Sequence, residues 1–266
     1  MDGMLDKAAF ARDGFDIVRR AVPQTLVAAL GEAFQRVQAS VSDLPPHLLE
    51  RLTFERDLTA DRRGGVAASE VGDAIFMLGD PVAFDAVFWS LLDQPTIVAT
   101  VRGALGVHDV AAHFMNVTTK HPGFGRGIGW HRDFPNRYAC PEASCFVRLM
   151  VCLDGMSDSM GATAFVPGSH LLDDTAARTL FRSGGQRPSH LDAVVLARCD
   201  PGDLIVIHPK VLHGGGMNTS SQARRNIVLQ AGDAEALMLA APDQESVGGR
   251  RLGLPLNERT GRHAQL

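Results

Sequence analysis

Short β-type runs dominate the chain after Gly106, and they limit its fold more than any other feature. Turn signals separate these runs, including Pro-Gly-Ser at 167–169 and Pro-Gly-Asp at 201–203. Strands at this spacing are typical of a β-sandwich or a β-barrel. The runs lie at 112–119, 145–153, 162–167, 193–199, 203–208 and 225–232.

Helical patterns precede the β-type runs. In the segment that opens at Pro23, four apolar residues recur at helical spacing and predict a face packed on the core: Leu26, Leu30, Phe34 and Val37. The charged segment 51–73 has weak periodicity and is interrupted by Gly64-Gly65, so it predicts a long loop. The other predicted elements are helices over 6–12, 82–92 and 96–105 and a short strand over 14–22.

The size and charge of the chain exclude several classes of protein. Its 266 residues can form one substantial β-rich domain, and neither an internal repeat nor a linker divides them. Lys and Arg number 26 against 30 Asp and Glu, so a nucleic-acid partner is not expected. The acidic stretch "MDGMLDKAAF" is not expected to act as a secretory leader. No apolar run is long enough for a bilayer, so no membrane partner is expected. Four cysteines without CxxC spacing fit a reducing cytoplasm, where we expect the protein to reside.

A histidine and a carboxylate lie two residues apart in the middle of the chain, in "GIGWHRDFPNRY". If this segment is extended, His131 and Asp133 point to the same face and can bind one metal ion. A further histidine, His208 or His213 in "DLIVIHPKVLHGGG", would complete a set of two histidines and one carboxylate. That set is the signature of non-haem Fe(II) oxygenases.

Several stretches, taken together, resemble the phytanoyl-CoA dioxygenase family of Fe(II)/2-oxoglutarate oxygenases. They are "AAFARDGFDIVRRAVP", "GWHRD", "GATAFVPGSH" and "PGDLIVIHPKVLHGGGMNTSSQARRNIVLQ", and they occur in the family's order. The resemblance implies a mainly β fold with flanking helices, a double-stranded β-helix or cupin-like jelly roll on which N-terminal helices pack. We therefore expect one domain over 1–266, with a largely helical part (1–106), a jelly-roll core (107–232) and a C-terminal extension (233–266).

The same resemblance implies roles for individual residues. His131, Asp133 and His213 match the iron ligands, whereas His208 matches a histidine with a structural role. Arg224 matches the arginine that holds the distal carboxylate of 2-oxoglutarate, and a guanidinium pairs well with a carboxylate. Arg225 is the alternative, and only one of the two can point inward because adjacent strand residues face opposite sides.

The chain departs from the family pattern at Gly215, where many relatives place a serine that assists the distal carboxylate. A hydroxyl from Thr163 or Thr118, or a water molecule, would then replace that serine. Lys120, in "TTKHPG", resembles a lysine that lies near the co-substrate in some members. A solvated loop lysine is the alternative interpretation of Lys120.

The resemblance implies Fe(II) as cofactor and 2-oxoglutarate and O2 as co-substrates of a hydroxylase. Halogenating relatives replace the carboxylate ligand by Gly or Ala, so Asp133 favours hydroxylation over halogenation. A family member that catalyses desaturation or halogenation instead of hydroxylation is an alternative. A metal-binding jelly roll that binds or senses a small molecule without turnover is the alternative, because fold alone does not decide activity. Nothing in the sequence indicates the oligomeric state.

Four residues near the metal motif are candidates for substrate contacts. Arg148 lies in the apolar run "CFVRLMVCL". It either faces the interior of the jelly roll and binds an anionic substrate, or it faces outward and pairs with a carboxylate on a helix. We favour the outward orientation. Arg137 follows the metal motif and lies at the pocket mouth or in solvent. Trp130 and Phe134 flank the ligands and either line the pocket or pack beside it.

Two long loops, 51–73 and 171–192, are candidates for lids over a pocket. No concentrated basic patch is present for the phosphates of a CoA thioester. The expected substrate is a small polar or anionic metabolite, such as an amino acid or its N-acyl derivative.

Overall fold

The computed structural model describes residues 3–175, 177, 194–240 and 246–254, and within this part the strands form three sheets. The largest has seven strands, and every neighbouring pair in it is antiparallel. In spatial order these strands are β1 (Phe15–Val18), β10 (Leu204–Ile207), β7 (Phe146–Cys152), β12 (Arg224–Asp233), β4 (Val110–Lys120), β3 (Ile75–Gly79) and β2 (Leu52–Phe54).

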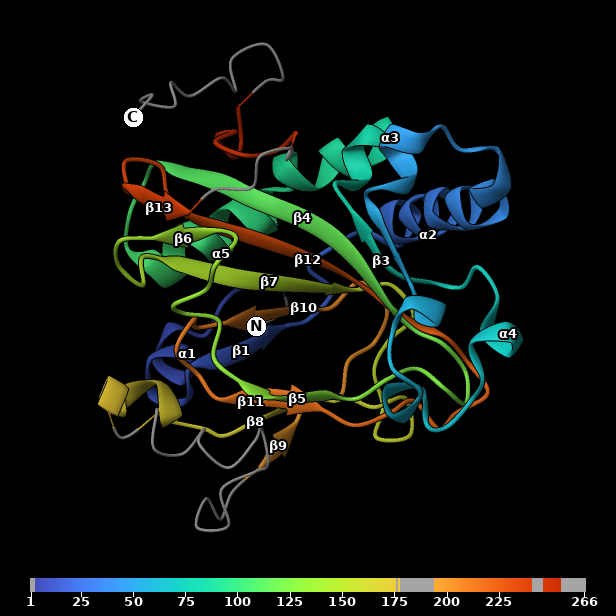
Figure 1. Ribbon diagram of the computed structural model, residues 1–266. Helices are drawn as coiled ribbons and strands as arrows, with labels where there is room; N and C mark the ends of the chain where they lie inside the picture. The colour runs from blue at the N-terminus through green and yellow to red at the C-terminus, as the bar shows by residue number, and fades with distance from the viewer. Residues whose placement is uncertain (1–2, 176, 178–193, 241–245, 255–266) are drawn as a thin grey trace.

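A smaller antiparallel sheet lies below the large one in Figure 1. Its strands, in order, are β5 (Ile128–His131), β11 (His213–Gly215), β8 (Thr163–Phe165) and β9 (Val195–Leu196). A third pair joins β13 (Met238–Ala240) to β6 (Cys140–Pro141). The chain passes between the two main sheets repeatedly, which makes the fold a double-stranded β-helix, or jelly roll, as the sequence predicts.

Most of the helices come before β4 in the chain, and the longer ones cover the outer face of the large sheet (Figure 1). Asp6 caps the first helix by accepting hydrogen bonds from the backbone N–H groups of Ala8 and Ala9, and the helix ends at Gly14, whose φ is 81°. The α-helices whose bounds are described are α1 (Lys7–Asp13), α2 (Gln24–Ala39), α3 (Pro46–Leu49), α4 (Ala68–Val71) and α5 (Pro95–Leu105). The 3₁₀ turns are η1 (Val41–Asp43), η2 (Glu55–Asp57), η3 (Ala60–Arg63), η4 (Pro81–Ala83), η5 (Ala86–Asp93) and η6 (Ser169–Leu171).

Alternate residues of the large sheet face two different environments, because side chains alternate along a strand. Ile227 and Leu229 of β12 are almost fully buried in one core cluster with Leu30 of α2 and Ile97 of α5. Burying each such side chain stabilises the fold by about 1.5–3 kcal/mol. The residues between them, such as Val228, face the smaller sheet and line a cavity.

Two predictions for the N-terminal half are wrong. Segment 51–73 is not one long loop, because β2 pairs with β3 before short helical turns follow. Three residues are too few to give a recognisable alternation in the sequence. Segment 82–92 forms 3₁₀ turns rather than an α-helix, and Asp85 interrupts it by accepting a hydrogen bond from the N–H of Val87. Most of the predicted lid at 171–192 lies outside the described residues.

The cysteines are all free thiols. Among the described residues, no helix is long and apolar enough to cross a membrane.

Candidate active site

A cavity of about 530 Å³ lies between the two main sheets. One wall is built by alternate residues of β4, namely Phe114, Asn116, Thr118 and Lys120. The opposite wall comes from the small sheet and from the chain that follows β5. The alternation that buries the other face of β4 under the helices therefore places polar side chains inside the jelly roll.

The two histidines of the metal motif lie on neighbouring strands of the small sheet. His131 ends β5 and is the direct cross-strand partner of His213, which begins β11. Their rings are 4.2 Å apart, centroid to centroid. Gly214 permits this close pairing, since a Cβ there would lie 3.0 Å from the carbonyl oxygen of Ile128.

Asp133 reaches the same point from the loop after β5. The backbone N–H groups of Asp133 and Phe134 both donate to the carbonyl oxygen of Pro209, at 2.8 and 2.9 Å. This carbonyl anchors the loop beside the segment that leads into β11. The His208-Pro209 step thus supports the carboxylate, while His208 itself packs against His170 and does not line the cavity.

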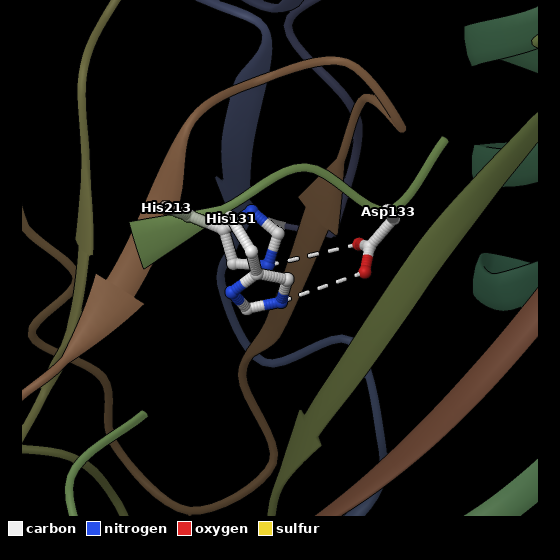
Figure 2. A group of neighbouring side chains, drawn as sticks. All are labelled: His131, Asp133 and His213. Carbon is white, nitrogen blue, oxygen red and sulfur yellow. Dashed lines mark ion pairs between the residues drawn. The ribbon is translucent and has the colours of Figure 1, made fainter. Parts of the chain in front are cut away.

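The three side chains converge on one point, as Figure 2 shows. Asp133 Oδ1 lies 3.7 Å from His131 Nε2, and Asp133 Oδ2 lies 3.6 Å from His213 Nε2. One ligand atom from each residue lies within 4.8 Å of the others, a spacing that suits a common metal ion.

Hydrogen bonds leave the correct imidazole nitrogens free for a metal. Nδ1 of His131 lies 2.9 Å from the carbonyl oxygen of Gly129, and Nδ1 of His213 lies 3.1 Å from that of Val211. A carbonyl can only accept, so each Nδ1 carries the proton and each Nε2 presents a lone pair. Burial also lowers the pKa of His213 to about 4, which keeps it neutral and able to bind a metal.

The charge of Asp133 is retained although its side chain is buried. Burial alone would raise its pKa, but Arg148 and the two histidines outweigh burial and hold the pKa below its usual value. Arg148 NH1 lies 3.2 Å from Oδ1. Oδ2 is buried without a hydrogen-bond partner, as expected for an oxygen whose partner is a cation. These residues fit a bound iron ion.

Two cations lie at another part of the cavity. Arg224 begins β12, is 3% exposed and donates to the carbonyl oxygen of Gly161 at 2.5 Å. Its cross-strand partner is Lys120, which is 2% exposed and donates to the carbonyl oxygens of Gly161 and Gly216. Burial, with Arg224 nearby, lowers the pKa of Lys120 to about 7, and burial lowers that of Arg224 to about 10.

No carboxylate contacts either of these two cations in the described part of the chain. Such a pair of buried cations fits an anionic ligand. Gly215 lies beside them, and a Cβ there would lie 3.2 Å from Nζ of Lys120. Lys120 therefore fills the space that a serine at position 215 would need.

Arg126 is a third cation at this end of the cavity, and the sequence did not single it out. Its guanidinium stacks on Phe76 at 4.4 Å and interacts electrostatically with the buried carboxylate of Glu55. Burial raises the pKa of Glu55 to about 7, against the opposing effect of Arg126 and Arg63.

The favoured interpretation of Arg148 as an outward arginine is wrong. Its direct neighbours across the sheet are Gln230 of β12 and Ile207 of β10, and its side chain lines the cavity. An arginine is stable in this apolar run because Asp133, across the cavity, supplies its counter-charge.

The other candidates near the motif lie differently. Trp130 and Phe134 are half-buried and are absent from the residues that line the cavity, and Arg137 is exposed. Phe134 instead packs near Phe146. Thr118 and Thr163 do line the cavity, and the hydroxyl of Thr163 lies 3.7 Å from the sulfur of Met150.

Among the further cavity residues that sequence reasoning missed are Phe114, Asn116 and Tyr138. Phe114 and Asn116 share a face with Thr118, so two-residue alternation within 112–119 would have found them. Tyr138 lies in the loop after the metal motif and carries no periodic signal.

The sequence model of the phytanoyl-CoA dioxygenase family (PhyH) matches residues 10–226. Dioxygenase cdmD of Talaromyces verruculosus is 32% identical over 108 residues, which are 40% of this chain and 32% of that protein. L-proline trans-4-hydroxylase of Streptomyces griseoviridis is 26% identical over 193 residues, which are 63% of this chain and 70% of that protein. The match thus spans about a third of cdmD and a larger part of the hydroxylase.

Among solved structures, the crystal structure of EctD from S. alaskensis with 2-oxoglutarate and 5-hydroxyectoine is similar at a TM-score of 0.71. The match covers 96% of this chain and 88% of that chain at 19% sequence identity. At this level of identity the likeness shows a shared fold.

Proposed function

Since the chain belongs to the phytanoyl-CoA dioxygenase family, we propose that it hydroxylates a C–H bond of a small polar or anionic metabolite. It is an oxygenase of the kind that uses Fe(II) and 2-oxoglutarate. Per turnover, 2-oxoglutarate and O2 yield succinate and CO2, and the second oxygen atom enters the substrate as a hydroxyl group.

One observation supports this function above the others: three converging side chains that can bind a metal line the same cavity as two buried cations that no described carboxylate contacts. We propose that His131, Asp133 and His213 hold the iron, which supplies the activation of O2 when bound. Three protein ligands on one side leave other coordination positions for the co-substrates.

We propose that Arg224 binds the distal carboxylate of 2-oxoglutarate. A Cβ on Gly215 would meet Lys120, the cross-strand partner of Arg224. Gly215 follows His213 by two residues in β11, so the proposed anchor lies roughly 7 Å along the strand from a proposed metal ligand. A five-carbon diacid can bridge that gap. The guanidinium supplies a planar fork, and Lys120 adds a point charge in place of the missing serine.

Thr118 and Thr163 are proposed to contact the co-substrate between these two ends, since both line the cavity there. Arg148 orients Asp133 through its contact with Oδ1, which leaves Oδ2 turned toward the histidines. The buried side chains of Asp133 and His213 and a cavity lined by Met150 and Val228 limit the access of water to the reacting C–H bond.

Asp133 favours hydroxylation over halogenation, because its carboxylate occupies the position that a halide would need. Two relatives support a hydroxylase: one is named L-proline trans-4-hydroxylase, and EctD was crystallised with 5-hydroxyectoine. An amino acid or an N-acyl amino acid is therefore our proposed substrate. A chlorinated product made in preference to a hydroxylated one would overturn this part of the proposal.

A binding module without turnover is the alternative, and the buried pair of Lys120 and Arg224 argues against it. Such a module does not need a separate anion-binding site next to the metal. The test is to incubate the chain with Fe(II), 2-oxoglutarate, O2 and a panel of amino acids and N-acyl amino acids. Succinate that forms together with a product heavier by one oxygen atom supports the proposal, and the absence of succinate under all conditions contradicts it.

A further inference from the structure

Arg148 and Arg224 lie far apart along the large sheet. Arg148 is paired with Gln230 in β12, and Gln230 follows Arg224 by six residues, or roughly 20 Å of strand. If 2-oxoglutarate occupies the Arg224 side of the metal site, the substrate has to bind on the side of Arg148. This inference therefore rests on the proposed function.

Aromatic rings hold the Arg148 guanidinium in place. Its carbon lies 5.1 Å from the ring centre of Phe114 and 5.4 Å from that of Tyr138, and the two rings meet edge to face. Arg148 also donates to the hydroxyl of Tyr138. Stacking fixes the plane of the fork without using its N–H donors.

Tyr138 itself is held by its loop although the residue is 49% exposed. The side-chain oxygen of Asn136 accepts hydrogen bonds from the N–H groups of Tyr138 and Ala139, at 3.1 and 2.7 Å. The amide nitrogen of Asn136 donates to the carbonyl oxygen of Asp133, so one residue ties the tyrosine to the metal motif. The phenol therefore lies at the open side of the cavity in a fixed position.

Arg148 has donors to spare. A guanidinium carries five N–H groups, and here NH1 meets Asp133 and NH2 meets Tyr138. Its Nε is buried without a hydrogen-bond partner. A buried, unused donor on a side chain that lines the cavity indicates that a ligand supplies the acceptor.

The charges around the cavity also call for an anion. Its lining contains four cationic side chains, Lys120, Arg126, Arg148 and Arg224, and a single carboxylate, Asp133. Iron(II) and the 2-oxoglutarate dianion cancel one another. Glu55, behind the lining, offsets the charge of Arg126. The loaded cavity therefore keeps an excess of positive charge, which a cationic substrate would increase and an anionic one would neutralise.

We propose that the Arg148 guanidinium, together with the Tyr138 hydroxyl, binds a carboxylate of the substrate and so selects which C–H bond faces the metal. The fork of an arginine matches a carboxylate with two parallel hydrogen bonds. The anchor is adjacent to Asp133, so the bound carboxylate lies next to the metal and the reacting carbon is close to it in the molecule. The inference thus predicts a carboxylic acid as substrate.

The test compares each acid of a panel with its uncharged carboxamide. Suitable pairs are L-proline with L-prolinamide and N-acetyl-L-leucine with N-acetyl-L-leucinamide, together with the corresponding pairs for the other amino acids. Binding is measured by calorimetry without O2, in the presence of Fe(II) and 2-oxoglutarate. We expect at least one acid to bind tenfold or more tightly than its amide, and no such preference in any pair would overturn the inference.

Variants then identify the anchor. Arg148→Gln is expected to reduce the affinity for the preferred acid to that for its amide, and Arg148→Lys to restore it in part. Tyr138→Phe is a conservative change at an exposed residue. It is expected to lower the affinity for the acid severalfold and to leave the affinity for the amide unchanged. Arg126→Gln is the matched control and is expected to keep the preference for the acid over the amide. If Arg126→Gln loses this preference and Arg148→Gln keeps it, the assignment of the anchor to Arg148 is wrong.

A purely supporting role of Arg148 toward Asp133 gives a different pattern. In that case Arg148→Gln weakens Fe(II) binding and affects acid and amide equally, which also overturns the inference. Binding of 2-oxoglutarate in the same samples separates this failure from failure of the proposed function. If 2-oxoglutarate binds but no acid is preferred, only the substrate inference is wrong; if 2-oxoglutarate does not bind, the proposed function is wrong.

Discussion

Arg224 and Arg225 are consecutive in β12, yet their guanidinium groups lie on opposite faces of the large sheet. Arg224 lines the cavity, whereas Arg225 pairs with Asp154 at 2.5 and 2.8 Å and donates to Gly31 in α2. Arg224→Ala is expected to remove the partner of the distal carboxylate. Breaking a buried pair costs on the order of 3–5 kcal/mol, or roughly a hundredfold or more in 2-oxoglutarate affinity. The measurement is the 2-oxoglutarate dissociation constant with Fe(II) present.

Arg225→Ala is the matched control for that experiment. It removes an arginine of the same strand and is expected to lower thermal stability, because it breaks the pair with Asp154, while changing 2-oxoglutarate affinity little. Arg224→Lys should rescue binding only in part, since an ammonium cannot reproduce the fork. Equal affinities for wild type and Arg224→Ala would place the anchor elsewhere.

The metal ligands can be separated from their neighbouring histidine. His131→Ala, Asp133→Ala and His213→Ala each remove one of three converging ligands and should weaken Fe(II) binding on the order of a hundredfold or more. His208→Ala should leave Fe(II) binding and measurable activity, because His208 packs against His170 outside the cavity. Calorimetric titration with Fe(II) without O2 measures the binding, and succinate formation in the presence of O2 measures the activity. Loss of iron in His208→Ala with retention in His213→Ala would refute the ligand set.

Lys120 predicts a pH dependence of co-substrate binding. Burial lowers its pKa to about 7, so the charged form prevails below that pH and the neutral form above it. A dianion binds the charged form better, so 2-oxoglutarate affinity should fall severalfold as the pH rises from about 6 to about 8.5. Arg224 stays charged throughout, since its pKa is about 10. Lys120→Met should bind more weakly and lose this pH dependence, whereas an unchanged slope in Lys120→Met would show that another group titrates.

The strands that carry the proposed iron ligands illustrate what the sequence could predict. The HxD spacing and the family resemblance led to the proposed ligand residues, but they did not predict the strands β5 and β11, because glycines in both obscure any alternation. The pairing of His131 with His213 joins positions 82 residues apart, and only the folded sheet reveals it. The same holds for the Pro209 carbonyl that supports Asp133.

For Arg148, the sequence predicted which residues share its face of the strand but not which way that face points. Its face of β7 was known from alternation, but which face of the strand meets the cavity depends on where the helices pack. The helices cover Val147, Leu149 and Val151, which leaves Arg148 inside. The long β-type runs were found because they are apolar and at least seven residues long, whereas β2, β6 and β13 are too short to show a period.

Glu55 predicts a pH dependence of stability. Burial raises its pKa in the folded state to about 7, above the ordinary value near 4.5, and both of its oxygens lack hydrogen-bond partners. As the pH rises, the unfolded chain therefore loses the Glu55 proton before the folded protein does. The contribution of Glu55 to stability is complete below about pH 4.5 and is lost as the pH rises through 7. The loss amounts to about 3 kcal/mol at most. Glu55→Gln should remove it.

Urea unfolding of wild type and Glu55→Gln at pH values near 5 and 8 measures this effect. Other titrating groups act equally on both proteins, so only the difference between them matters. The variant is expected to lose less stability than wild type between the two pH values. Identical losses would mean that Glu55 is ionised in the folded protein over the whole range.

The most direct test of a shared iron and co-substrate site is the binding of 2-oxoglutarate with and without Fe(II), measured by calorimetry without O2. His213 and Arg224 line the same cavity, so wild type should bind 2-oxoglutarate more tightly when Fe(II) is present. His213→Ala should bind it weakly and equally under both conditions, with Arg224 still in place. Wild-type protein that binds 2-oxoglutarate equally well with and without Fe(II), or not at all, would contradict the site described above.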